Sequence, residues 1–117
     1  MKYDLEDRTK KFSFDIMYLL HKVKKNEITR PLISQCVRAA TSIGANYREA
    51  NAASSKKDFR NKIAICRKEI KETKYWIDLL QNQEPALQSA FTPLAKEVHE
   101  LDLIFNKIYS TLRTSVT

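Results

Sequence analysis

The sequence predicts an all-α protein, specifically an antiparallel up-down-up-down four-helix bundle. Its 117 residues include one glycine and three prolines, so there is little material for turns. Four stretches repeat apolar residues at steps of three and four, which is the spacing along one face of an α-helix. No stretch shows the strict alternation of a strand. Short connections between four amphipathic helices make sequence neighbours antiparallel, and the length suits a single domain over residues 1–117.

The first helix is expected over residues 4–25 and the second over residues 31–52. Apolar positions of the first recur at helical spacing, namely Phe12, Ile16, Leu19, Leu20 and Val23. Acidic residues at its start and lysines at its end suit the two poles of the helix dipole. The second begins with Pro31, a residue favoured in a first turn. Its apolar face comprises Ile33, Cys36, Val37, Ala40, Ile43, Gly44 and Tyr47.

The third helix is expected over residues 56–83 and the fourth over residues 93–113. Ser55 and Asp58 resemble a capping box ahead of the third helix. Its apolar residues alternate steps of four and three, the seam of left-handed helix packing: Phe59, Ile63, Cys66, Ile70, Thr73, Ile77 and Leu80. Thr92 and Pro93 are interpreted as an N-cap and a first-turn proline of the fourth helix. That helix repeats the four-three alternation from Leu94 to Leu112.

The formal net charge is +7 and the sequence pI is near 9.5, a balance that favours anionic partners such as RNA, DNA or an acidic protein surface. The alternative is that the charge only keeps the protein soluble. Cys36 and Cys66 lie on apolar helix faces and are expected to be buried, with a disulfide or a catalytic thiol as the alternatives. The N-terminus does not resemble a signal peptide, and no apolar run approaches about 20 residues, so the expected compartment is the cytoplasm.

Residue patterns that would indicate an enzyme are missing from the sequence. The two histidines, His21 and His99, have no glutamate three positions before them and belong to no metal-ligand motif. A chain with a single glycine contains no phosphate-binding loop or dinucleotide fingerprint. The sequence therefore predicts a protein that is not an enzyme, with no catalytic residues, no metal site and no cofactor.

Positive charge is concentrated on the third helix, which predicts a nucleic-acid-binding surface. Over residues 56–74 of that helix, eight basic residues face only three acidic ones, Asp58, Glu69 and Glu72. Five of the basic residues are spaced to share one broad side next to the seam and are the predicted binding residues: Lys57, Arg60, Arg67, Lys71 and Lys74. The alternative is a solvated face with local ion pairs. Candidate aromatic residues for base stacking are Tyr3, Phe14, Tyr18, Tyr47 and Tyr75, most of which are expected to pack internally.

Small residues gather on the second helix around Gly44. A glycine inside a helix costs about 1 kcal/mol relative to alanine, so its presence indicates a close approach. The predicted oligomer-interface or close-packing residues are Ala39, Ser42, Gly44, Asn46, Tyr47 and Glu49. Self-association is the favoured explanation. Close approach within the monomer, or a solvent-facing row of helix formers, are the alternatives.

The run RAATSIGANYREANAASSKKDFRNKIAICRKEIKETKYWIDLL, Arg38 to Leu80, resembles the four-helix-bundle proteins encoded in intervening sequences of bacterial 23S ribosomal RNA genes. The resemblance covers somewhat over a third of the chain. It implies an antiparallel bundle and a ring-like homopentamer. The family is similar to the accessory protein of diversity-generating retroelements, a basic pentamer that binds a reverse transcriptase and nucleic acid. The matching signature positions, expected to have structural or interface roles, are Gly44, Asn46, Glu49, Glu69, Glu72 and Trp76.

Together these observations predict a non-enzymatic, cytoplasmic, homo-oligomeric bundle that contacts RNA or DNA through the basic side of its third helix. One alternative is a protein-interaction adaptor that docks an acidic partner, such as a reverse transcriptase. The other is a structural oligomer of unknown role.

Overall fold

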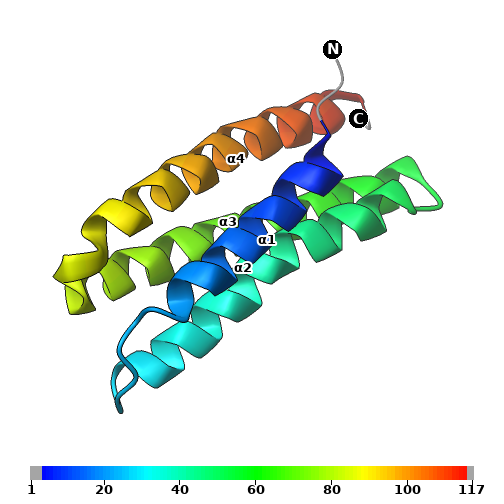
Figure 1. The fold of residues 1–117 in the computed structure, drawn as a ribbon. Helices are drawn as coiled ribbons and strands as arrows, with labels where there is room; N and C mark the ends of the chain where they lie inside the picture. Colours follow the sequence, from blue (N-terminus) through cyan, green and yellow to red (C-terminus); the bar gives the residue numbers. More distant parts are fainter. Residues whose placement is uncertain (1–3, 116–117) are drawn as a thin grey trace.

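Four long helices and one short 3₁₀ helix make up the computed structural model, which describes residues 4–115 (Figure 1). The helices are α1 (Leu5–Leu20), α2 (Thr29–Asn51), α3 (Lys56–Gln83) and α4 (Gln88–Ser115), with η1 (Pro85–Leu87) between the last two. No strand occurs within these described residues. The predicted all-α class and the antiparallel four-helix bundle are confirmed.

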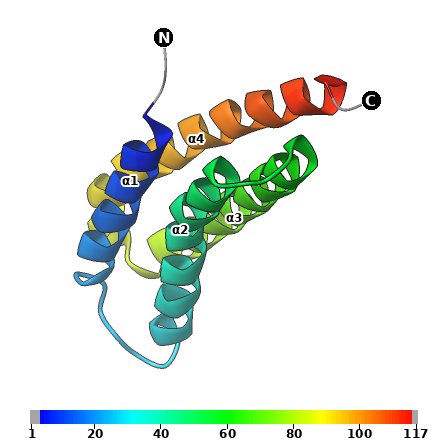
Figure 2. The same cartoon turned by 90° about the vertical axis from the view of Figure 1, so that its right-hand side faces the viewer.

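The helices form a bundle in which α1 and α3 occupy diagonal positions. Helix α1 packs against α2 and α4, and α3 packs against the same two helices. Figures 1 and 2 show α1 on one side of the molecule and α3 on the opposite side. Outward-facing residues of α1 and α3 therefore belong to different surfaces.

Side-chain caps define two of the helix starts. The Asp4 carboxylate accepts a hydrogen bond from the backbone N–H of Asp7 at 3.1 Å, and Ser55 Oγ accepts one from Asp58 at 3.0 Å. Each bond satisfies an N–H group that has no partner within the helix. The Ser55 cap agrees with the start expected from the sequence for α3.

Two helix boundaries differ by five residues from the predicted ones, and the others agree to within two residues. Helix α1 ends at Leu20 rather than residue 25. Val23 lies in the connection after the helix, where its side chain is still buried in the core. Its burial continues the apolar pattern beyond the last helical residue. Helix α4 begins at Gln88 rather than residue 93, because η1 leads directly into it. Thr92 is therefore not an N-cap, and Pro93 lies inside α4.

The core is apolar and contains the predicted seam of α3. Three phenylalanines are fully buried in it, Phe12 from α1 and Phe91 and Phe105 from α4. Ile63, Ile70 and Leu80 of α3 have exposed fractions of 0%. Burial of such a side chain contributes about 1.5–3 kcal/mol, so the core supplies the main drive for folding. No helix within the described residues is long and apolar enough to cross a membrane.

Gly44 lies where α2 packs closely against α1. A Cβ atom at this position would be 2.9 Å from Thr9 Oγ1 and 3.3 Å from Thr9 Cβ. Thr9 is buried, and its hydroxyl donates a hydrogen bond to the Leu5 carbonyl at 2.6 Å, which restrains its rotation. The glycine is thus required by a contact within the monomer, so the predicted close packing does not need a second subunit.

We expect Gly44→Ala to lower the free energy of unfolding by about 1–2 kcal/mol. Overpacking costs about 1–3 kcal/mol, whereas alanine improves helix propensity by up to about 1 kcal/mol. Chemical denaturation measures the difference. In a Thr9→Ala background the cost should shrink, because the hydroxyl is gone. Stabilisation by Gly44→Ala, or an equal cost in both backgrounds, would contradict the contact.

Cys36 and Cys66 are free and fully buried, so they do not form the disulfide considered from the sequence. Burial raises the pKa of each thiol to about 12. Because the thiolate is the reactive form, such groups behave as small apolar side chains at neutral pH.

We expect both thiols to react with a water-soluble disulfide reagent at pH 8 only as fast as the protein unfolds. Unfolding exposes the sulfurs and lowers their pKa toward the ordinary value, so denaturant should accelerate the reaction by orders of magnitude. Absorbance of the released reagent gives the rate. Rapid modification of the native protein would show that one cysteine is accessible.

Candidate nucleic-acid interface

The predicted basic residues of α3 fall into two groups in the structure. Lys57 and Lys71 are exposed on its outer side. Arg60, Arg67 and Lys74 are half-buried along the edge where α3 meets α4. The spacing of these residues predicted one broad side for all five. In the structure, Arg60, Arg67 and Lys74 are also bonded to α4.

Arg60 and Arg67 both pack against the ring of Tyr109 on α4. Their guanidinium carbons lie 5.4 Å and 4.2 Å from the ring centroid, and Arg60 Nη2 donates a hydrogen bond to the Tyr109 hydroxyl at 3.3 Å. Arg67 Nε donates a hydrogen bond to Asn106 Oδ1 at 2.8 Å. These partners are uncharged, so both arginines are positioned without losing their positive charge.

Lys74 differs because its partner is a carboxylate. Its Nζ lies 3.1 Å from Oδ2 of Asp102, whose side chain is 12% exposed, and 3.4 Å from His99 Nδ1. The buried Asp102 neutralises this lysine, which therefore contributes little positive field. The remaining four residues, Lys57, Arg60, Arg67 and Lys71, form no ion pair within the described part of the chain and are called the α3 basic patch below.

Most of the small-residue row on α2 packs inside the monomer. Ala39 and Gly44 are buried, and the Tyr47 ring meets Phe105 edge-on at a centroid distance of 5.5 Å. Asn46 Nδ2 donates to the backbone carbonyl of Ser42 at 2.8 Å, and both residues are half-buried.

Glu49 is the exposed member of the predicted set. Its carboxylate pairs with Lys62 of α3 at 2.8 Å, so it connects α2 and α3 at the surface. Of the predicted set, Ala39 and Gly44 are therefore taken up inside the monomer, whereas the other four residues are half-buried or exposed.

Three of the residues in the sequence resemblance form an ion-pair network between α2 and α3. Arg38 Nη1 lies 3.2 Å from Oε1 of Glu69, and Arg38 also hydrogen-bonds Glu72 through Nη2. The Glu69 side chain is only 8% exposed, whereas that of Arg38 is 46% exposed. The sequence resemblance included Glu69 and Glu72 but did not identify Arg38 as their shared partner, because Arg38 lies 31 or more residues before them in the chain.

We expect Arg38→Met to lower the free energy of unfolding by about 1–3 kcal/mol, because it leaves the buried Glu69 carboxylate without a cation. Urea denaturation would measure this loss in the free energy of unfolding. The cost should be smaller in a Glu69→Gln background, where no charge is stranded. Lys11→Met is the matched control, since it breaks an exposed pair with Asp15 and should cost about 0.5 kcal/mol or less. Equal costs for the two substitutions would refute a structural role for the buried pair.

The side chains of a metal site or of a catalytic histidine–carboxylate pair are not brought together in the part of the chain that the structure describes. No cluster of three histidine, cysteine or carboxylate side chains suitable for a metal ion occurs among residues 4–115. His99 contacts a lysine rather than a catalytic carboxylate. The feature of chemical interest on this side of the molecule is therefore the α3 basic patch.

The fold and this surface define a class, namely small four-helix bundles with a basic face. A model of the family described as 23S rRNA-intervening sequence protein matches residues 2–107, so the chain belongs to that family. A crystal structure of a protein with unknown function from the S23 ribosomal protein family of Bacteroides thetaiotaomicron is similar to it. The identity is 31%, the TM-score is 0.78, and the match covers 89% of this chain and 96% of that one. No curated protein is similar enough to count as a match.

Proposed function

We propose that this protein is a non-enzymatic nucleic-acid-binding bundle that contacts phosphates through the α3 basic patch. The observation that supports this most is the neutral environment of Arg60 and Arg67, which are held by Tyr109 and Asn106 instead of by carboxylates. Rigid, uncancelled guanidinium groups are suited to phosphate oxygens. A net charge of +7 adds a general attraction for polyanions.

The patch also has a length that suits a nucleic-acid strand. From Lys57 to Lys71 the helix axis rises about 21 Å, at about 1.5 Å per residue. Phosphates of one strand of a duplex repeat about every 3.4 Å along the axis, so the patch extends over about six of them. These contacts depend on the charge and spacing of the phosphates rather than on the identity of the bases. We therefore expect binding without marked sequence preference.

A homo-oligomer, a pentamer by family resemblance, and a cytoplasmic location remain part of this proposal. The small-residue row is divided between buried and exposed positions and does not by itself favour self-association. The family resemblance favours it, because that resemblance implies a ring-like homopentamer. Light scattering on the purified protein would determine the mass directly.

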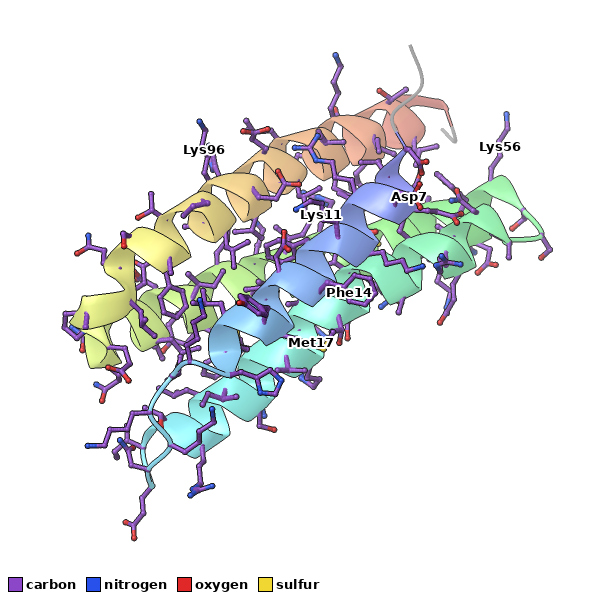
Figure 3. The ribbon with its side chains drawn as sticks, viewed as in Figure 1. Asp7, Lys11, Phe14, Met17, Lys56 and Lys96 are labelled. Carbon is purple, nitrogen blue, oxygen red and sulfur yellow. The ribbon has the colours of Figure 1, made fainter. Side chains whose placement is uncertain are left out.

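We expect the double variant Lys57→Gln/Lys71→Gln to weaken binding to RNA and to reduce the dependence of log K on log salt by about 1.4–1.8, since each lost phosphate contact reduces it by about 0.7–0.9. Both lysines are exposed and form no side-chain hydrogen bond or ion pair with α4 among the described residues, so the fold should be unaffected. Lys96→Gln is the control, because Lys96 projects outward from α4, away from the patch (Figure 3). Fluorescence anisotropy across a salt series gives both slopes.

Absence of RNA binding at low salt, or an equal effect of Lys96→Gln, would rule the proposal out. Binding to an acidic protein with no binding to RNA would instead identify an adaptor. Charge reversal at Arg60 or Arg67 is unsuitable for this test, because both side chains also pack against Tyr109 and their loss would disturb α4.

A further inference from the structure

The outward side of α1 presents two aromatic rings between lysines. Lys10, Phe14, Tyr18 and Lys22 recur every four residues and are all exposed. The exposed fractions are 57% for Phe14 and 69% for Tyr18, large for rings of this size. Figure 3 shows Phe14 on the outward side of α1, away from α3. These four residues are called the α1 ladder below.

The lysines of the α1 ladder lie over its rings. Lys22 Nζ is 4.7 Å from the centroid of Tyr18, and Lys10 Nζ is 6.0 Å from that of Phe14. Such contacts restrain two otherwise flexible cations against exposed aromatic rings. The result is a short row in which positive charge and flat apolar surface alternate.

Each ring also borders an open hollow. Phe14 lines one of about 330 Å³ between α1 and α2, together with Lys10, Arg48 and Glu6. Tyr18 lines one of about 290 Å³ between α1 and α4, together with Lys22, Asp15 and Pro93. The volumes are near the lower limit for small-molecule sites, so each hollow suits a single flat group. Each also contains a carboxylate: Glu6 accepts from Asn51 and lies 3.9 Å from Arg48, and Asp15 pairs with Lys11 through one oxygen. A carboxylate has lone pairs beyond these contacts with which to accept from an amino group.

We propose that the α1 ladder is a stacking platform for unpaired bases of single-stranded nucleic acid. Aromatic side chains beside basic ones are the arrangement with which proteins bind single strands. The rings would stack on two bases, Lys10, Lys22 and Arg48 would meet the phosphates, and Glu6 and Asp15 would face exocyclic amino groups. A duplex keeps its bases stacked and paired, so it gains only the contacts to phosphate.

A second copy of the chain that pairs through its own α1 is a poorer occupant of the same surface. Antiparallel pairing of two α1 helices would bring Lys10 of one copy toward Lys22 of the other, and parallel pairing would bring identical lysines together. Like charges at such positions are destabilising. An anionic membrane surface is also a poorer fit, because α1 buries its continuous apolar stripe in the core and exposes only two rings.

The α1 ladder is independent of the function proposed for α3. The two surfaces face outward from diagonal helices whose backbones are not neighbours, so substitutions at one are expected to leave the other intact. The α3 basic patch is expected to bind single strands and duplexes alike. The α1 ladder is expected to bind single strands alone.

The test compares a fluorescent oligouridylate with a duplex RNA of equal length in anisotropy titrations. Phe14→Ala and Tyr18→Ala should each weaken oligouridylate binding about tenfold, within the range measured for loss of base stacking. Duplex binding should change less than twofold. Tyr18→Phe should keep full affinity, because the ring remains. Leu103→Ala is the matched control, since Leu103 on α4 is as exposed as Phe14, at 57%, and should have no effect.

Several results would overturn the proposal. One is unchanged oligouridylate affinity in the Phe14→Ala/Tyr18→Ala double variant, and another is an equal loss for the duplex. A change of mass in light scattering on the same substitutions would assign the face to a subunit contact. Ring-dependent binding to phosphatidylserine vesicles would assign it to a membrane. Lys57→Gln/Lys71→Gln weakening both RNAs while the α1 variants affect neither would retain the α3 function and refute the α1 ladder.

Discussion

The close approach of Gly44 to Thr9 is the constraint on which the arrangement of the bundle depends. With no Cβ at position 44, α1 can lie against α2 at a distance that a larger residue would forbid. Helix α1 has only 16 residues, and this contact lies in its first half. Its position on α2 determines which side chains point outward and how it faces α4. The exposed rings of Phe14 and Tyr18, and the hollows beside them, follow from that placement.

Along its edges, helix α4 is bonded to basic residues of α1 and α3, and the nature of their partners decides whether each positive charge is neutralised. On the α1 side, Arg8 pairs with Glu97 at 2.7 Å and with Glu100 at 2.9 Å, which cancels its charge. On the α3 side, Lys74 is cancelled by Asp102. Arg60 and Arg67 instead use Tyr109 and Asn106, so they pack and remain cationic at the same time. A basic face thus coexists with a tightly packed helix pair.

The sequence predicted the helices well because burial on one face imposes a regular spacing. The seam from Ile63 to Leu80 needs no knowledge of the partner helices. Boundaries were less predictable, since Val23 is buried by a turn and Pro93 is tolerated within α4. The candidate site was only partly predictable. Charge density marks α3, but the partner of each cation lies on another helix, and spacing within α3 does not reveal that Asp102 faces Lys74.

The α1 ladder was only partly predicted: the sequence named Phe14 and Tyr18 among the candidates for base stacking, but most of those rings were expected to pack internally. Steps of four place Phe14 and Tyr18 near one another, but an aromatic residue at helical spacing is usually part of a core. Only the positions of α2 and α4 show that these two rings are left outside. Conversely, the small residues around Gly44 suggested a second subunit, whereas the nearest neighbour is Thr9 of the same chain.

The central claim is that two diagonal helices offer two different surfaces to nucleic acid, and amide chemical-shift mapping tests it most directly. With ¹⁵N-labelled protein titrated with oligouridylate, shifts should occur on α1 around Phe14 and Tyr18 and on α3 around Lys57 and Lys71. With duplex RNA the α3 shifts should persist and those of α1 should vanish. Shifts confined to other helices, or the same pattern for both RNAs, would contradict the claim.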